Sequence, residues 1–200
     1  MTSRTPHRIV LVHGYGATPQ DHWFPWLSRL GTPVDAPALP DPTAPRAEEW
    51  ISRAAAAIGR TDARTVVVTH SLGGITALQA LARLLRDGRA REPLAGFLAV
   101  APFVDPLPAV GDPQLDAFPD RGLGRFLEGF APEAIRELLG PVTVLRSDDD
   151  AIVPAAHSDR TAEALRAETV IVPGAGHFLA EDGVRELPAL GARLGTLLGG

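Results

Sequence analysis

Short apolar runs alternate with segments of helical pattern along the whole chain, and this alternation is the feature that most constrains the fold. The runs VVV at 66–68 and GFLAV at 96–100 are too apolar for either side to face water. Continuous apolar runs of this length are typical of parallel strands that helices cover on both faces. The pattern therefore predicts an α/β fold with a mostly parallel sheet of about six strands.

The bounds of the expected elements follow from the apolar pattern and from its proline and glycine breaks. The strands are expected at 8–12, 33–37, 65–69, 94–101, 142–146 and 169–172. The helices are expected at 23–30, 47–58, 72–87, 132–139, 155–166 and 184–198. A chain of 200 residues has room for one full core, so we expect a single domain over 1–200.

One stretch, residues 102–131, does not fit the alternation. It holds five prolines and four phenylalanines. A loop of this length inside a compact domain is usually functional or disordered, and the phenylalanines argue against disorder. We expect this stretch to form a small lid over the carboxyl ends of the strands.

Composition excludes several classes of function. The net charge of −5 leaves no basic surplus for binding nucleic acid. All nineteen cationic side chains are arginines, which excludes Schiff-base chemistry on lysine. The chain has no cysteine, which excludes thiol catalysis, disulfides and cysteine-ligated zinc. No apolar run reaches the length of a membrane span or signal peptide, so we expect a cytoplasmic protein without nucleic-acid or membrane partners.

Four of the predicted strands end in motifs rich in glycine and polar residues. These motifs are HGYG at 13–16, HSLGG at 70–74, SDDDAIVP at 147–154 and GAGHF at 174–178. Ligands of parallel α/β sheets bind beyond the carboxyl ends of the strands, so the motifs are expected to meet in one site.

The stretch TVVVTHSLGG at 65–74 places Ser71 directly after a buried strand, as in a nucleophile elbow. A serine hydroxyl needs a base, for which His177 between two glycines is the candidate, and the base needs an orienting carboxylate, for which Asp150 is favoured. The order Ser, Asp, His is that of α/β-hydrolases. The backbone N–H groups of Tyr15 and Leu72 are the candidates for an oxyanion hole.

The same motifs carry a resemblance that extends over nearly the whole chain. With HGYGATPQDHW at 13–23, THSLGG at 69–74, SDDDAIVP and GAGHF, the sequence resembles the α/β-hydrolase superfamily. It is most similar to the small YdeN-like serine hydrolases related to the retinoblastoma-binding-protein hydrolase. The resemblance implies a Ser-Asp-His triad on Ser71, Asp150 and His177, and activity on small esters and amides. Thr69 departs from the glycine usual in the family, which predicts crowding beside the elbow.

Other side chains near these motifs leave alternatives open. Asp105, after the fourth strand, is the rival for the catalytic acid. The alternative for Asp148, Asp149 and Asp150 alike is a solvated turn. The three aspartates could also suggest a divalent metal, but no second group of ligands supports one. We therefore expect no metal and no cofactor.

The remaining histidines and aromatic residues are assigned supporting roles. His13 is expected to brace the oxyanion loop, His70 to pack beside the elbow and His157 to lie on the surface. The candidates for the wall of a substrate pocket are His22, Trp23, Phe103 and Phe178. Trp23 fits the core equally well, and the alternative for His22 is to cap a helix.

The sequence therefore predicts a serine hydrolase that cleaves small carboxylic esters, or small amides, through an acyl-enzyme on Ser71. The first alternative is a non-catalytic binding or regulatory protein on a hydrolase scaffold. The second alternative is a nucleotide-binding domain. Gly14 and Gly16, followed by Asp35, partly match the glycine-rich fingerprint of dinucleotide-binding folds, but Pro19 occupies the position of its third glycine. The natural substrate and the oligomeric state do not follow from the sequence.

Overall fold

The computed structural model describes residues 8–111, 113–118 and 122–199. Six strands form one parallel sheet in the order β2-β1-β3-β4-β5-β6. They are β1 (Arg8–Val12), β2 (Val34–Asp35), β3 (Thr65–His70), β4 (Gly96–Val100), β5 (Val142–Arg146) and β6 (Glu168–Ile171). The predicted parallel α/β fold is therefore confirmed.

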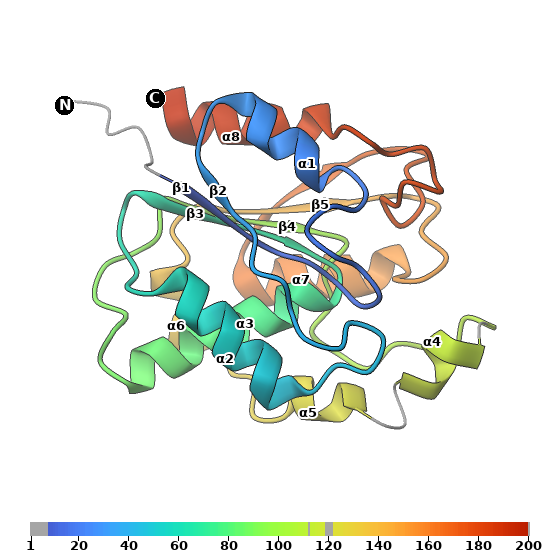
Figure 1. Cartoon of the computed structure of the whole chain (residues 1–200), viewed down its shortest axis with the longest axis horizontal. Helices are drawn as coiled ribbons and strands as arrows, with labels where there is room; N and C mark the ends of the chain where they lie inside the picture. The colour runs from blue at the N-terminus through green and yellow to red at the C-terminus, as the bar shows by residue number, and fades with distance from the viewer. Residues whose placement is uncertain (1–7, 112, 119–121, 200) are drawn as a thin grey trace.

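Helices cover both faces of this sheet (Figure 1). On one face lie α1 (Phe24–Leu27) and α8 (Pro188–Gly199). On the other lie α2 (Ala47–Ile58), α3 (Leu72–Arg86), α6 (Pro132–Ile135) and α7 (Ala155–Leu165).

Strand β3 shows why the sequence folds in this way. Its side chains alternate between the two faces: Val67 packs in the cluster under α2 and α3, whereas Val66 and Val68 pack in the cluster under α1 and α8. All six of its residues are buried, which explains the unbroken apolar run.

Several elements differ from the predicted ranges. Strand β2 is only two residues long and lies at the edge of the sheet, where prolines on either side limit its ladder. The predicted helix at 23–30 is divided into α1 and a 3-10 turn, Ser28–Leu30. The closing helix begins at Pro188 rather than at 184, because the N–H of Val184 donates to the carbonyl of Leu179 in a preceding turn.

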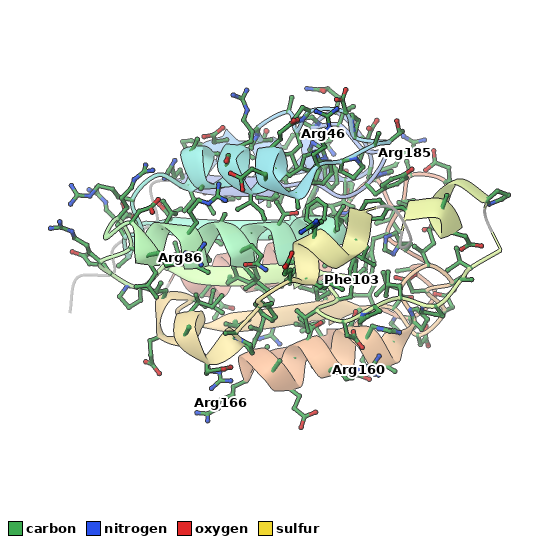
Figure 2. All side chains as sticks on the ribbon, turned by 90° about the horizontal axis from the view of Figure 1, so that it is seen from below. Arg46, Arg86, Phe103, Arg160, Arg166 and Arg185 are labelled. Atoms are coloured by element: carbon green, nitrogen blue, oxygen red, sulfur yellow. The ribbon has the colours of Figure 1, made fainter. Side chains whose placement is uncertain are left out.

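The stretch 102–131 contains two short helices, α4 (Pro113–Phe118) and α5 (Gly124–Leu127), while residues 112 and 119–121 lie outside the described residues. The side-chain amide of Gln79 in α3 donates to the carbonyls of Phe126 and Glu128 (2.9 and 3.0 Å) and ties α5 to the core. Phe103 is buried in the interior, in contrast to the labelled arginines, which are exposed (Figure 2). The stretch is therefore packed against the domain.

Among the residues that the structure describes, no helix combines the length and the apolar character needed to cross a membrane.

Candidate active site

Ser71 lies on the sharp turn between β3 and α3. Its backbone has φ 53° and ψ −125°, in a region that residues other than glycine rarely adopt. The N–H of Ser71 donates to the carbonyl of Val100 (2.9 Å), and its own carbonyl accepts from the N–H of Gly74 (2.8 Å). The turn is thus held from both sides in a strained form, as expected of a nucleophile elbow.

Two glycines allow the chain to pass close to this turn. A Cβ atom on Gly73 would lie 2.1 Å from the carbonyl oxygen of Val12 and 2.7 Å from that of His13. A Cβ atom on Gly14 would lie 3.0 Å from Cβ of Ser71. Helix α3 can therefore start against the end of β1 only because position 73 lacks a side chain, and the absence of one at position 14 relieves a tight approach of the loop to Ser71.

Thr69 occupies the position at which an elbow usually has glycine. Its side chain is fully buried, with Val12 of β1 and Ala99 of β4 as its neighbours in the sheet. Its Oγ1 atom has no hydrogen-bond partner within the described part of the chain. The elbow accommodates the larger residue, but at the cost of a buried hydroxyl without a partner.

Tyr15 and Leu72, the candidates for an oxyanion hole, line the same small cavity as Ser71. Leu72 is the first residue of α3, and Tyr15 lies in the loop after β1. Neither N–H donates a hydrogen bond to another of the residues that the structure describes. An oxyanion hole requires donors of this kind, and the positive end of the α3 dipole favours an anion there.

His13 holds the loop that carries Tyr15. Its Nδ1–H donates to the carbonyl of Gly14 (3.0 Å), and its Nε2 accepts from the N–H of Leu39 (3.2 Å). Burial lowers the pKa of His13 below its ordinary value, which favours the neutral form that both hydrogen bonds require. This geometry agrees with the bracing role predicted for His13.

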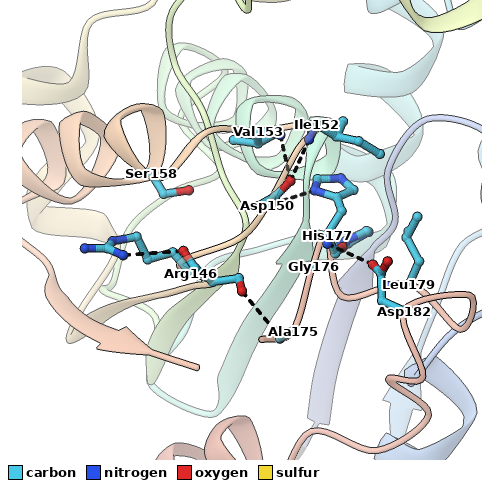
Figure 3. A network of polar contacts seen from close by, with 12 residues as sticks. Arg146, Asp150, Ile152, Val153, Ser158, Ala175, Gly176, His177, Leu179 and Asp182 are labelled. Carbon is cyan, nitrogen blue, oxygen red and sulfur yellow. Dashed lines mark hydrogen bonds and ion pairs between the residues drawn. The ribbon is translucent and has the colours of Figure 1, made fainter. Parts of the chain in front are cut away.

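The side chains of His177 and Asp150 meet at the carboxyl ends of β5 and β6. His177 Nδ1 lies 2.7 Å from Asp150 Oδ2, and both side chains are almost fully buried. Asp150 Oδ1 accepts from the N–H groups of Ile152 and Val153 (2.9 and 2.8 Å) (Figure 3). Because a carboxylate accepts, the proton of the imidazole is on Nδ1, and Nε2 forms no hydrogen bond with another of the residues that the structure describes.

The loops that carry these two residues are joined along their length. Three side chains of one loop accept hydrogen bonds from the backbone of the other. The Asp148 carboxylate accepts from the N–H of Gly174 (2.9 Å), and the Asp149 carboxylate accepts from the N–H of Gly176 (2.8 Å). The Ser147 hydroxyl accepts from the N–H of Ala175 (3.0 Å). The hydroxyl of Ser147 and the N–H of Gly176 lower the pKa of Asp149. Residues 147–150 thus bind residues 174–177 one by one. The side chains of Asp148 and Asp149 are still exposed, so the solvated turn is confirmed for these two residues but not for the buried Asp150.

Two further residues hold the backbone of His177. The buried His70 donates from Nε2 to the carbonyl of His177 (2.9 Å), and the two rings are 4.9 Å apart. Burial lowers the pKa of His70 well below its ordinary value, and electrostatic repulsion between the two imidazoles lowers it further. Asp182 accepts from the N–H groups of His177 and Leu179 (2.8 and 3.0 Å). Sequence reasoning missed Asp182, because it lies in an irregular turn that has no periodic pattern.

His70 is the residue before Ser71, so its bond to His177 links the elbow directly to the histidine loop. Among the described residues, Ser71 Oγ and the His177 imidazole do not form a hydrogen bond. Catalytic hydrogen bonds are often long before substrate binds, so this separation does not exclude proton transfer.

The rival acid, Asp105, is engaged elsewhere. It accepts from Arg160 Nε (2.7 Å) and lies 2.8 Å from Nδ1 of His157. The prediction of a surface position for His157 is wrong: it is 8% exposed, because α7 packs against the start of the stretch 102–131. The hydroxyl of Ser158 donates to the carbonyl of Pro102 (2.9 Å) in the same contact.

A small apolar cavity of about 50 Å³ opens beside Ser71. Its wall includes Tyr15, Leu72, Phe103, Phe118 and Ile152. Its one carboxylate within the described residues, that of Asp116, is turned to the N–H groups of Val110 and Gly111 (2.7 and 2.9 Å). Phe103 therefore lies where a pocket wall was predicted.

The other predicted wall residues do not line this cavity, and the prediction is corrected for them. Trp23 and Phe178 are fully buried in the core under α1 and α8. His22 instead accepts from the N–H of Ala180 (3.0 Å) and so supports the loop after His177. The chemical character of these three side chains is compatible with the pocket wall and with the core or a supporting loop, so only the packing of the fold decides where each one lies.

No group of three or more histidine, aspartate or glutamate side chains in the described part of the chain is arranged to hold a metal ion. The three aspartates at 148–150 are instead occupied by backbone N–H groups and by His177.

Comparisons with known proteins concern the family and the fold of the chain. Residues 9–196 match the sequence model of a family described as serine hydrolase. YdeN of Bacillus subtilis (strain 168) is 31% identical over 186 residues, which cover 90% of each chain. The crystal structure of the ydeN gene product superposes with a TM-score of 0.83 over 96% of this chain and 99% of that one, at 30% identity.

More distant solved structures share the fold. Esterase PE8 is 22% identical, with a TM-score of 0.57 over 98% of this chain and 95% of that one. At this level of identity, the likeness concerns the fold alone.

Proposed function

Because the chain belongs to the serine hydrolase family, we propose that it cleaves small carboxylic esters through an acyl-enzyme formed on Ser71. The observation that carries the proposal is the buried contact of 2.7 Å between His177 and Asp150, at the same sheet edge as the strained turn of Ser71. An imidazole held in this way has its free nitrogen available as a general base.

In the proposed reaction the Ser71 hydroxyl attacks the acyl carbon and His177 Nε2 takes its proton. The N–H groups of Tyr15 and Leu72 stabilise the oxyanion of the tetrahedral intermediate. The imidazolium then gives its proton to the leaving alcohol, or to the amine of a small amide. Water hydrolyses the acyl-enzyme with His177 again as base, and Asp150 stabilises the imidazolium in both halves.

The two other classes of function have less support. A nucleotide-binding loop opens directly into a helix, whereas the loop after β1 is followed by turns, and α1 begins only at Phe24. A non-catalytic binding protein on this scaffold would have no need of an Asp150 carboxylate whose two oxygens are directed to His177 and to two N–H groups.

Hydrolysis of p-nitrophenyl butyrate tests the proposal. The wild type should show a burst of p-nitrophenol equal to the enzyme concentration if deacylation is slower than acylation. Ser71→Ala and His177→Ala should each lose kcat/KM by at least a factor on the order of 10³. The matched control Ser52→Ala, on the exposed face of α2, should behave as the wild type. Ester turnover that survives in Ser71→Ala would contradict the proposal.

A further inference from the structure

The cavity beside Ser71 ends at a pair of aromatic rings, and a second hollow lies behind them. Tyr15 and Phe118 line both spaces. The first has a volume of about 50 Å³, the space of a few water molecules. The second, which also involves Thr43 and Pro45, has a volume of about 250 Å³. Since the same two side chains border both spaces, the rings act as the partition between them.

The two rings of the partition are held differently. Their centroids lie 5.2 Å apart, and the Tyr15 hydroxyl donates to the carbonyl of Thr43 (2.8 Å). Phe118 packs against Phe126 at 6.1 Å and covers Gly122, where a Cβ atom would lie 3.0 Å from its Cε2. Tyr15 is thus fixed by a hydrogen bond and carries a proposed oxyanion donor, whereas Phe118 contributes only its ring.

The wall of the first cavity indicates which part of a substrate it receives. Ser71 and both proposed oxyanion donors line it, but His177 does not, as far as the described residues show. The leaving group must face the imidazole that protonates it. The cavity therefore lies on the other side of the scissile bond and receives the acyl group.

We propose that Phe118 is a specificity-determining residue that ends the acyl pocket and limits the enzyme to acyl groups of a few carbons. The inference rests on the function proposed above and adds its substrate class. Removal of the ring joins the small cavity to the larger hollow and opens a path for a longer apolar chain. Each methylene that becomes buried should favour the transition state by about fourfold.

The test compares p-nitrophenyl octanoate with p-nitrophenyl butyrate in the wild type and in Phe118→Ala. The ratio of their kcat/KM values should rise at least about tenfold in the variant, since several added methylenes gain contacts. Phe118→Leu should give an intermediate ratio. The matched control Phe130→Ala removes a half-buried ring of the same segment that borders neither space, and its ratio should equal that of the wild type.

If Phe118→Ala still hydrolyses butyrate and the ratio of the two substrates is unchanged, the inference is overturned and the proposed function stands. The inference is also overturned if Phe118→Ala changes the dependence of kcat/KM on the length of the alcohol in acetate esters but not its dependence on the length of the acyl chain. Binding of unreactive ketones gives a readout that does not depend on catalysis. The dissociation constants of methyl propyl ketone and methyl heptyl ketone are measured for Ser71→Ala and for the double variant that also carries Phe118→Ala. Tighter binding of the longer ketone only in the double variant supports the partition even if the wild type hydrolyses no ester.

Discussion

Replacement of Asp150 by asparagine keeps the shape of the side chain but should impose the wrong tautomer on His177. Asp150 Oδ1 accepts from the N–H groups of Ile152 and Val153, so the amide oxygen of asparagine must take this position. The opposite orientation would turn an NH₂ group against two N–H donors, at a cost of about 1–3 kcal/mol for the buried N–H of Val153 alone. The NH₂ group therefore faces His177 Nδ1, which must then accept, and the proton moves to Nε2.

An imidazole with a proton on Nε2 cannot take one from Ser71, and the imidazolium also loses its carboxylate. In a serine protease with the same triad, the replacement of the aspartate by asparagine costs about 10⁴ in kcat. We expect kcat/KM of Asp150→Asn to fall by a factor on the order of 10²–10⁴, which corresponds to about 3–5 kcal/mol of transition-state stabilisation. Kinetics on p-nitrophenyl butyrate measure the loss, and ¹⁵N chemical shifts of the His177 ring report the tautomer directly.

The matched control is Asp105→Asn. Asp105 is engaged with Arg160 and His157, so its replacement should cost less than about tenfold. Asp148→Asn and Asp149→Asn should cost equally little, because the amide oxygen can still accept from Gly174 and Gly176. The reasoning is refuted if Asp105→Asn proves the crippled variant while Asp150→Asn keeps its activity.

Three further predictions concern the elbow, the pocket and the response to acid. Thr69→Gly should keep kcat/KM within about tenfold of the wild type. It should lower the free energy of unfolding, measured in urea, by about 1–2 kcal/mol, since a buried side chain is lost and the unfolded chain gains freedom. A variant that is a thousandfold faster would mean that Thr69 disables the wild type. Butyrate esters should be hydrolysed faster than palmitate esters, with no activation at the lipid interface, because the cavity is only about 50 Å³; the opposite order would contradict the small pocket. The pKa of His70 is held well below 6.5 in the folded state, so the unfolded chain binds the proton first as the pH falls. The free energy of unfolding should therefore decrease between about pH 7 and pH 5, and less steeply in His70→Gln; equal slopes in urea titrations would argue against a neutral buried His70.

Much of the fold could be predicted because the burial of a strand is directly visible in its apolar residues. All six residues of β3 are buried, and an apolar run of this kind has few alternatives to a central parallel strand. The ends of elements were harder to predict. Val184 and Leu187 have the spacing of a helix that continues into α8. The chain instead first closes a turn in which the N–H of Val184 donates to the carbonyl of Leu179, and the helix begins at Pro188.

The candidate site divides in the same way. Ser71, Asp150 and His177 could be named because each follows a strand, and strand ends of a parallel sheet converge. The wall of the pocket could not be named, because an aromatic residue such as Trp23 or Phe178 serves equally well in the core. The support that Asp182 gives to His177 depends on a bond within an irregular turn, for which the sequence has no periodic signal.

The central claim is that His177 activates Ser71, and labelling with a fluorophosphonate tests it most directly. The reagent reacts with an activated serine whatever the natural substrate is. Mass spectrometry of the labelled wild type should find the adduct on Ser71 and on no other serine. The adduct should be absent in Ser71→Ala and slowed by a factor on the order of 10³ in His177→Ala. Equal labelling of the wild type and His177→Ala, or an adduct on another serine, would contradict the account.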